Sequence, residues 1–388
     1  MKILHLCLAS FYIDNNSYQE NLIPRMHKRM GHEVKIIAST ETYVDHKKLG
    51  YIQPSSYLNE DNIPVERIPY VKFLPSKFAH KLRLYKYVYK KINDFHPDFV
   101  FVHGCQFVSI ISLKKYLAKH KEVKAVVDGH TDFHNSAKGL VSYKILHKIV
   151  YKICAQIIKP YVAAFFGTLP ARADFFVDVY NIPREMVSLL PMGADDDIIN
   201  KVDNDIVKKD IRDHYAISNN DFLIVTGGKI NHNRPETLNL IEAVIKTDIP
   251  NVKLLFFGSV SDEYIDDFNR LTDSERFINV GWQPSEKTCE FLAAADLVVF
   301  PGLHSVMWEQ AVALGKPCVF RKLDGFEHVD IGGNAVFIED TSTSALMNLI
   351  NELADKNCVM YQNMLKVASS SKKDCFLYSK IAEQSLDV

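Results

Sequence analysis

The stretch from residue 295 to residue 334 constrains the fold of this chain more than any other part. It reads ADLVVFPGLHSVMWEQAVALGKPCVFRKLDGFEHVDIGGN. The apolar run Leu297 to Phe300 is typical of a parallel strand covered on both faces, and Pro301 ends it because proline has no amide donor. An amphipathic helix, a second apolar run and a glycine-bearing loop follow. The pattern predicts a β-α-β unit of an open α/β sheet.

Polar residues gather beyond the carboxyl end of the first predicted strand. Ligands of open α/β sheets bind at that edge, so His304, Ser305 and Glu309 are candidate site residues. Glu309 stands in the first turns of an apolar helix, where a carboxylate favours the positive helix end and can accept hydrogen bonds from sugar hydroxyls. An acid that only begins a helix has the same position, so the pattern alone leaves both interpretations open.

The same stretch resembles the donor site of GT-B glycosyltransferases, in particular glycosyltransferase family 4. The residues that carry the resemblance are Pro301, Gly302, Glu309, Ala311, Gly315, Lys316 and Pro317. The resemblance implies that Glu309 holds the nucleotide ribose. The family usually has a second glutamate eight residues earlier, where this chain has Pro301. We therefore expect His304, with Ser305, to make the donor-sugar contacts that this loop usually provides.

The length of 388 residues, 47% of them hydrophobic, suits two globular domains. The sequence PMGAD, which ends at Asp195, resembles the hinge-proximal Pro-x-Gly-x-Asp element of the family. We expect an acceptor domain at 1–192 and a nucleotide-sugar domain at 193–373, with a C-terminal helix, 374–388, packing back on the first domain. The expected fold class is α/β, with two Rossmann-like domains facing a central cleft (GT-B).

Charge is divided unevenly between the two halves of the chain. Up to Asp195 there are 27 Lys and Arg against 17 Asp and Glu, and beyond it 19 against 30. The run 72–91 has seven Lys and Arg, no acid and several aromatic residues, which predicts a basic helical segment. Such a segment is either a solvated surface helix or a docking surface for an anionic membrane. Nucleic acid is not an expected partner, since no recognised nucleic-acid module accompanies the run.

A glycine pair with two nearby cations opens the second predicted domain. Gly227 and Gly228 follow a predicted strand, 222–226, and a proline then opens the next helix. Glycines let the backbone approach an anion, and the helix start offers free amides. The element resembles the family's Gly-Arg-(x)4-Lys-Gly, with Lys229 at the arginine and Arg234 at the lysine. We expect Gly228, Lys229 and Arg234 to bind the donor diphosphate.

One histidine of the first half is a candidate for the chemistry. His130 stands just past a predicted strand, beside carboxylates, where it can act as an acid, a base or a hydrogen-bond donor to a sugar. A structural histidine would look the same. The resemblance supports the functional reading, because the family carries a histidine at the matching strand end, facing the donor sugar. His103 is the lesser candidate.

The resemblance also implies further contacts. Trp282 would lie near the nucleotide base, and Glu327 would add a polar group near the donor sugar. Asn15 and Asn16 stand in the first loop, where the family usually has a glycine pair. Asparagine tolerates left-handed backbone, so a ligand can still approach closely there.

Together these observations predict a hexosyltransferase-like enzyme. It would move a sugar from a nucleotide-sugar to a glycan, lipid-linked or protein acceptor, with retention and with neither a metal nor another cofactor, in the synthesis of cell-surface polysaccharide or glycoconjugate. A sugar-nucleotide isomerase or phosphorylase of the same fold, and a non-catalytic GT-B partner subunit, stay open. We expect no signal peptide and no membrane span, hence a cytoplasmic protein able to dock at the inner membrane face.

Overall fold

A computed structural model describes the chain from residue 1 to residue 388, except residues 10, 45–47, 134–135, 137–140, 273 and 356. The chain forms two compact units. The first consists of Met1–Met192 and Tyr378–Val388, and the second of Gly193–Leu377. The closing helix was expected from residue 374, whereas helix α15 begins at Tyr378.

The first unit is built on an eight-stranded sheet in the order β10-β9-β8-β7-β1-β2-β6-β5. Its strands are β1 (Lys2–Cys7), β2 (Glu33–Ser39), β5 (Ser55–Leu58), β6 (Pro64–Ile68), β7 (Phe99–His103), β8 (Lys124–Gly129), β9 (Ala164–Gly167) and β10 (Val187–Leu189). Neighbouring strands are parallel, except that β5 runs antiparallel to β6. A separate antiparallel hairpin joins β3 (Glu41–Val44) to β4 (Lys48–Tyr51).

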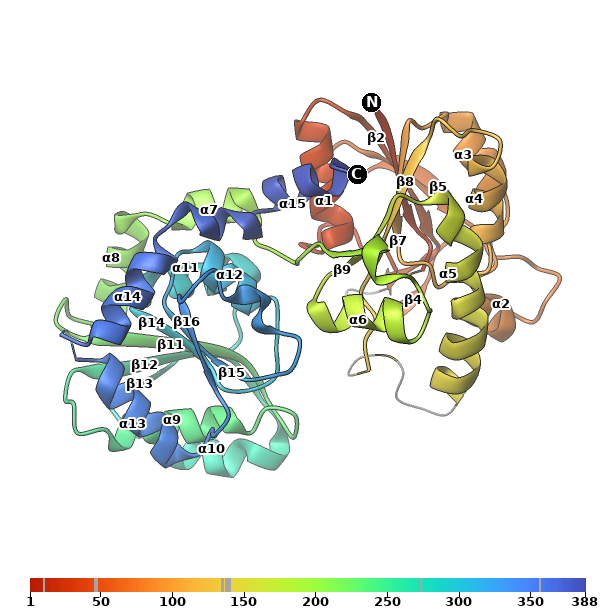
Figure 1. Cartoon of the computed structure of the whole chain (residues 1–388). Helices are drawn as coiled ribbons and strands as arrows, with labels where there is room; N and C mark the ends of the chain where they lie inside the picture. The colour runs from red at the N-terminus through yellow and green to blue at the C-terminus, as the bar shows by residue number, and fades with distance from the viewer. Residues whose placement is uncertain (10, 45–47, 134–135, 137–140, 273, 356) are drawn as a thin grey trace. The chain divides into compact units, whose positions relative to one another are not determined.

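Helices cover both faces of this sheet (Figure 1). They are α1 (Gln19–Arg29), α2 (Ser76–Leu82), α3 (Val88–Phe95), α4 (Ile110–Leu117), α5 (Lys152–Ile158), α6 (Pro170–Asp178) and α15 (Tyr378–Leu386), and a π-helix (Val141–Tyr151) leads directly into α5. Successive strand residues point to opposite faces. Leu4 and Leu6 therefore pack in one core with α3, α4 and α5, whereas Ile3 and Cys7 pack in the other with α1 and α15.

The sequence predicted that the basic run 72–91 is helical. In the structure it contains α2 and the start of α3, with a break between them. Arg83 and Tyr87 adopt left-handed backbone, with φ of 50° and 68°. Between them Tyr85 is buried, its amide donates to Ser109 Oγ at 2.7 Å, and its hydroxyl donates to a backbone carbonyl of the core. The two left-handed residues place Tyr85 in the core with both of its polar groups hydrogen-bonded, and the helix is interrupted there.

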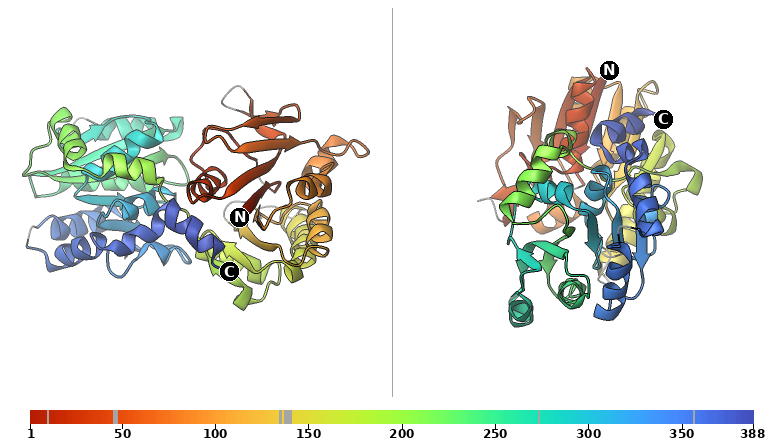
Figure 2. Two further views of the ribbon diagram at one scale, coloured as in Figure 1. Left: turned by 90° about the horizontal axis from the view of Figure 1, so that it is seen from above. Right: turned by 90° about the vertical axis from the view of Figure 1, so that its left-hand side faces the viewer.

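The second unit has a six-stranded sheet in the order β13-β12-β11-β14-β15-β16, all parallel. The strands are β11 (Phe222–Ile230), β12 (Val252–Val260), β13 (Phe277–Asn279), β14 (Leu297–Phe300), β15 (Cys318–Arg321) and β16 (Ala335–Ile338). The helices are α7 (Asp196–Val202), α8 (Asp205–His214), α9 (Glu236–Lys246), α10 (Ile265–Leu271), α11 (Ser285–Ala294), α12 (Met307–Ala313), α13 (Thr343–Leu353) and α14 (Val359–Ala368). They lie on both sides of the sheet, with α9, α10 and α13 on one side (Figures 1 and 2). The predicted α/β class with two Rossmann-like units is confirmed.

The sequence predicted that the glycine pair of the second unit follows a strand, but the structure places both glycines within the strand. Strand β11 continues through it to Ile230, and Gly228 pairs with Gly258 of β12. A Cβ at Gly227 would lie 2.2 Å from the ring of Phe257, and a Cβ at Gly258 would lie 1.8 Å from the carbonyl oxygen of Gly228. These glycines therefore allow close packing along the strands, and the polar turn begins later, before Arg234.

Among the described residues, no helix has both the length and the hydropathy that crossing a membrane requires.

Candidate functional site

The strand order of the second unit reverses between β11 and β14. From β11 the chain proceeds to β12 and β13 on one side, and from β14 to β15 and β16 on the other. Open α/β sheets bind ligands beyond the carboxyl ends of the strands at such a point. Arg234 follows β11 and His304 follows β14, and Arg234 Nη2 donates to the carbonyl oxygen of His304 at 3.0 Å. The structure thus brings these two predicted site residues together.

Glu309 lies in the first turn of α12 and its side chain is fully buried. Its Oε1 lies 3.0 Å from His304 Nε2 and 2.8 Å from His328 Nε2, and its Oε2 lies 3.1 Å from His304 Nε2. An ionised carboxylate can only accept, so both Nε2 atoms carry hydrogen. Burial alone would raise the pKa of Glu309, but the two histidines outweigh it and lower the pKa to about 2. Glu309 is therefore a buried carboxylate whose two oxygens already have donors.

His328 was not predicted, and its neighbour Glu327 was. The Glu327 side chain is exposed, and its Oε2 accepts from the amides of Gly325 and Phe326 at 3.1 and 3.0 Å. The next residue, His328, points inward instead. Its side chain is only 2% exposed and contacts Glu309. Sequence reasoning found the loop after β15 but not His328, because only the turn geometry decides which side chain reaches Glu309, and contact of Glu327 with a donor sugar stays a prediction.

The other predicted donor residues lie in different surroundings. Trp282 is 74% exposed, which excludes a core role, whereas Trp308 is fully buried and stacks on Phe320 with ring centroids 4.3 Å apart. Lys229 is exposed on β11. The carbonyl of Ser305 accepts from the Trp308 amide at 3.0 Å and so helps to begin α12. Contact of Trp282, Lys229 or Ser305 with a nucleotide stays a prediction.

One group in the described parts of the chain could hold a metal ion. The candidate ligand atoms of His304, Glu309 and His328 all lie within 4.8 Å of one another. A histidine that binds a metal ordinarily donates its other ring N–H to a partner. Nδ1 of His328 is buried and has no hydrogen-bond partner among the described residues. Hydrogen bonds to Glu309 account for the contacts of this cluster without an ion.

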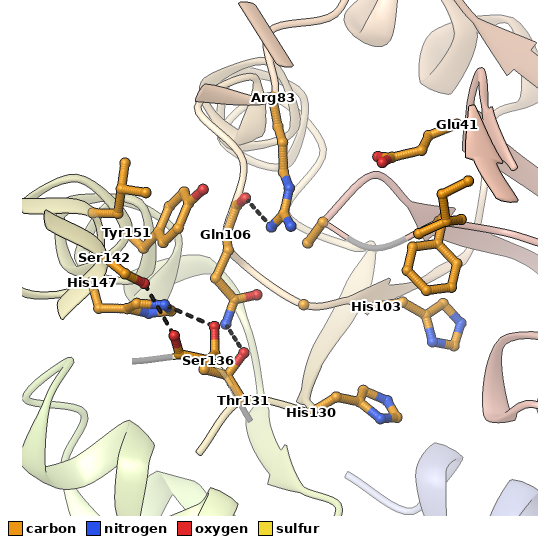
Figure 3. Close-up of a pocket in the computed structure, with 15 residues that line it drawn as sticks. Glu41, Arg83, His103, Gln106, His130, Thr131, Ser136, Ser142, His147 and Tyr151 are labelled. Carbon is orange, nitrogen blue, oxygen red and sulfur yellow. Dashed lines mark hydrogen bonds between the residues drawn. The ribbon is translucent and has the colours of Figure 1, made fainter. Parts of the chain in front are cut away.

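The first unit holds a pocket of about 650 Å³ at the carboxyl ends of β1, β7 and β8 (Figure 3). Its lining residues include Ala9, Phe11, Glu41, Leu49, Arg83, His103, Gly104, Gln106, His130, Thr131, Ser136, Ser142, Leu146, His147 and Tyr151. The strand order of this unit reverses between β1 and β7, so the pocket again lies where such sheets bind ligands. The lining is mostly polar and aromatic, which suits a hydroxylated ligand.

A hydrogen-bond network crosses one wall of this pocket (Figure 3). His147 lies 3.1 Å from Ser136 Oγ through Nε2 and 2.8 Å from the Tyr180 hydroxyl through Nδ1. The amide of Gln106 donates to the same hydroxyl at 3.3 Å and to Thr131 Oγ1 at 3.4 Å. Burial lowers the pKa of His147 to about 4, so its imidazole is neutral near pH 7. Sequence reasoning missed this network, whose members come from separate segments of the chain.

His130 lines the same pocket with its side chain 31% exposed, and its Nε2 lies 3.3 Å from Asp128 Oδ2. Burial opposes charge on the imidazole, but the buried carboxylate of Asp128 outweighs it and raises the pKa of His130. His103 lies on the other side of Asp128, with Nδ1 at 3.1 Å from the same Oδ2. The structure places both predicted histidines around one carboxylate that the sequence analysis did not name.

The first loop was predicted to use asparagine where left-handed backbone is needed. Asn15 has a φ of 59°, which confirms the left-handed conformation at this position. Its amide donates to Glu60 Oε1 at 3.0 Å. Asn16 follows with a half-buried side chain. Contact of either residue with a ligand stays a prediction.

Comparison with known proteins gives a family for part of the chain and a fold for all of it. Residues 221–356 match the family described as "Glycosyl transferases group 1". No curated protein sequence matches the chain.

Solved structures share the fold at low identity. HepE from Anabaena, in complex with UDP and glucose, is 17% identical with a TM-score of 0.62, over 99% of this chain and 98% of that one. A glycosyltransferase from Rickettsia africae is 13% identical with a TM-score of 0.68, over 100% and 97%. UDP-GlcNAc 2-epimerase from Neisseria meningitidis, bound to UDP-GlcNAc, is 12% identical with a TM-score of 0.60, over 100% and 99%. The region that holds Arg234, His304 and Glu309 thus matches the group 1 glycosyl transferases, and the chain has the GT-B fold of solved glycosyltransferases.

Proposed function

We propose that this protein transfers a sugar from a nucleotide-sugar donor to an acceptor, with the nucleotide bound by the second unit. The observation that carries the proposal is the convergence of Arg234, His304 and Glu309 beside the switch point of the sheet, within the region that matches the glycosyl transferases. The likeness of the fold to HepE, solved with UDP and glucose, supports a uridine nucleotide as the first donor to test.

Stabilisation of the departing diphosphate is the main demand of such a transfer. Negative charge grows on the leaving group as the glycosidic bond breaks, and fixed cations lower the barrier. Arg234 is half-buried, and its Nη1 lies beside Gly228, where a Cβ would come within 3.2 Å of it. The missing side chain leaves room for phosphate oxygens, and the exposed Lys229 supplies a second cation. With these two charges we propose transfer without a metal or other cofactor.

Recognition of the ribose and the sugar is proposed to pass through the imidazoles that hold Glu309. Because each Nε2 donates to the carboxylate, the Nδ1 atoms of His304 and His328 are left for a ligand. The buried Nδ1 of His328 has no donor among the described residues, and a buried polar atom without a partner costs about 1–3 kcal/mol. A ligand hydroxyl would satisfy it.

The acceptor is proposed to bind in the pocket of the first unit, with His130 as the acid, base or hydrogen-bond donor. The support is its exposure to the pocket together with the carboxylate of Asp128 behind it. The resemblance to glycosyltransferase family 4 further favours retention of the anomeric configuration. The acceptor class proposed is a glycan, lipid-linked or protein acceptor of cell-surface polysaccharide or glycoconjugate synthesis.

A peripheral membrane location is proposed from one face of the first unit. Ile145, Ile149 and Ile153 recur at every fourth residue along the π-helix and α5, and each side chain is half-exposed or more. Lys148 and Lys152 line the same surface groove as Ile149 and Ile153. Apolar side chains flanked by lysines suit the boundary of an anionic bilayer, where each cation adds about 1 kcal/mol.

Vesicle binding tests this location. Ile149→Asp should weaken binding to anionic vesicles, and binding of the unmodified chain should fade between about 50 and 300 mM salt. Ile206→Asp is the matched control, since Ile206 is also an exposed isoleucine on a helix but lies in the acidic second unit. Equal binding to neutral vesicles, or no binding to anionic ones, would contradict the membrane location and indicate that this helical face is only solvated.

A panel of nucleotide-sugars tests the function itself. A ligand at 100 times its dissociation constant should stabilise the protein by about 2.7 kcal/mol. The donor that raises the melting temperature should then be consumed with release of its nucleoside diphosphate when glycan or lipid-linked acceptors are added. The likeness to UDP-GlcNAc 2-epimerase favours one second candidate, an isomerase, which NMR of the recovered sugar would reveal. Binding without any turnover would indicate a non-catalytic subunit.

A further inference from the structure

Three buried histidines of the first unit form a continuous line that ends at Asp128. His27 Nδ1 lies 3.1 Å from His5 Nε2, and His5 Nδ1 lies 3.0 Å from His103 Nε2. His103 Nδ1 then lies 3.1 Å from Asp128 Oδ2. At the other end, His27 Nε2 lies 3.0 Å from the hydroxyl of Ser385 in α15. Every imidazole nitrogen of the line has a partner.

Two of these histidines and Asp128 are held in register by the sheet, whereas His27 lies on α1. His5 is on β1, His103 on the neighbouring β7, and Asp128 on β8, directly opposite His103 in the parallel register. All three are at most 1% exposed. The rings of His5 and His103 lie nearly parallel, 24° apart, with centroids separated by 5.3 Å. Strand pairing therefore sets the spacing of the line between His5 and Asp128.

The groups at the two ends of the line limit where the hydrogens of the imidazoles can be. Asp128 and the backbone carbonyl of Ala382, 3.2 Å from His27 Nε2, can only accept. Four contacts then need four hydrogens, whereas three neutral imidazoles supply three. The fourth hydrogen comes either from the hydroxyl of Ser385, turned to His27 and away from the Ala382 carbonyl to which it donates at 2.8 Å, or from one additional proton balanced by Asp128.

Both fillings have the same consequence for the end of the line at Asp128 and opposite consequences for the end at His27. His103 carries a hydrogen on Nδ1 and donates it to Asp128 in each case. His5 and His27 share one tautomer in each case, with the hydrogen on Nδ1 when Ser385 fills the line and on Nε2 when the extra proton does. Burial lowers the pKa of both His5 and His27, which agrees with two neutral rings.

Asp128 connects this line to the pocket. Its Oδ1 accepts from the Gly104 amide at 3.0 Å, and its Oδ2 is shared by His103 and His130. Donors on both oxygens fix the rotation of the carboxylate, and the carboxylate fixes the ring of His130. A change at His5 or His27, neither of which lines the pocket, would therefore reach His130 through His103 and Asp128.

We propose that Asp128 and the line His103, His5 and His27 are positioning residues for His130, and the proposal rests on the sugar transfer proposed above. They hold the imidazole of His130 in the orientation that the acceptor or the donor sugar meets. Helix α15 takes part through Ser385, which contacts His27 at the far end of the line.

Variants of His103 separate positioning from folding. His103→Asn keeps an N–H donor near the place of Nδ1, whereas His103→Leu removes it. With the donor sugar found in the panel, His103→Leu should lower kcat by roughly tenfold or more and leave KM for the donor within about twofold, because misplacing a reacting group affects mainly the chemical step. His103→Asn should recover most of the loss. His120→Asn, outside the line, is the control. Equal kcat in His103→Leu and the unmodified chain would overturn the proposal.

NMR of the imidazole nitrogens tests the line independently of turnover. We expect His103 to be protonated at Nδ1, and His5 and His27 to share one tautomer. The ring-nitrogen shifts of His130 should change in His103→Leu and stay unchanged in His120→Asn. If no nucleotide-sugar is turned over, the proposed transfer fails while these shifts still decide whether the line holds His130. An unprotonated Nδ1 on His103, or His130 shifts indifferent to His103→Leu, would refute it.

Discussion

Acidification probes the burial of His27 without any substitution. His27 is fully buried against α15, and burial, more than the opposing hydrogen bond to the Ala382 carbonyl, lowers its pKa to about 3. In the unfolded chain a histidine titrates near 6.5. Because the folded-state pKa is the lower one, the unfolded chain binds more protons between these values. The stability that neutral His27 allows is present above about pH 6.5 and is lost as the pH falls towards 3.

The size of the loss follows from the two pKa values. One pKa unit is worth about 1.36 kcal/mol, so the full difference of about 3.5 units is worth roughly 4 to 5 kcal/mol. Between about pH 7.5 and pH 5, the titration of His27 lowers the free energy of unfolding by about 2 kcal/mol. His5, whose pKa burial also lowers, adds to the loss in the same direction.

Urea unfolding followed by far-UV circular dichroism measures this loss. Tryptophan fluorescence would not, since both tryptophans, Trp282 and Trp308, belong to the second unit. His27→Gln should be less stable at pH 7.5 but should lose about 2 kcal/mol less than the unmodified chain on going to pH 5. His120→Gln, on the surface beyond α4, should follow the unmodified chain. An identical loss in His27→Gln would refute the assignment of a neutral, buried His27.

Three further predictions concern the second unit. Arg234→Ala should weaken UDP binding by roughly tenfold to more than a hundredfold in calorimetry, and Arg270→Ala, an exposed control, should not; equal affinities would contradict a diphosphate contact. His304→Ala should lower turnover far more than affinity for the bare nucleotide, whereas Glu309→Ala should weaken both; unchanged turnover in His304→Ala would assign the loop a structural role. Trp308→Ala should cost about 3–5 kcal/mol in urea unfolding, because the ring is fully buried; a loss below about 1 kcal/mol would contradict its packing.

Long apolar runs made the sheets predictable. Strand β14 has the bounds that were predicted for it, Leu297–Phe300, because a strand covered on both faces must be apolar throughout. The glycine pair after Thr226 was not predictable in this way. Glycine is typical of turns, but here β11 continues through the pair, and the Phe257 ring of β12 fills the space of a side chain at Gly227, which only the tertiary packing shows.

The candidate site was predictable at the level of loops and less so at the level of side chains. The structure places three residues selected by their position beyond a strand end, His304, Glu309 and His130, in polar clusters, and their contact with a ligand stays a prediction. It could not choose between Glu327 and His328, which differ by one residue in a short turn. Asp128 was not predicted as a site residue, because its role depends on contacts with His103 and His130 that the sequence does not show.

The two units share one physical solution at their polar edges. In each, a fully buried carboxylate accepts from two imidazoles: Asp128 from His103 and His130, and Glu309 from His304 and His328. A buried carboxylate alone would take up a proton, since burial penalises its charge. The paired histidines instead lower the pKa of both carboxyl groups. The carboxylates in turn fix the tautomer and direction of the rings. Under the proposed function, the groups that meet a sugar are therefore imidazoles of defined orientation, with the carboxylates held behind them.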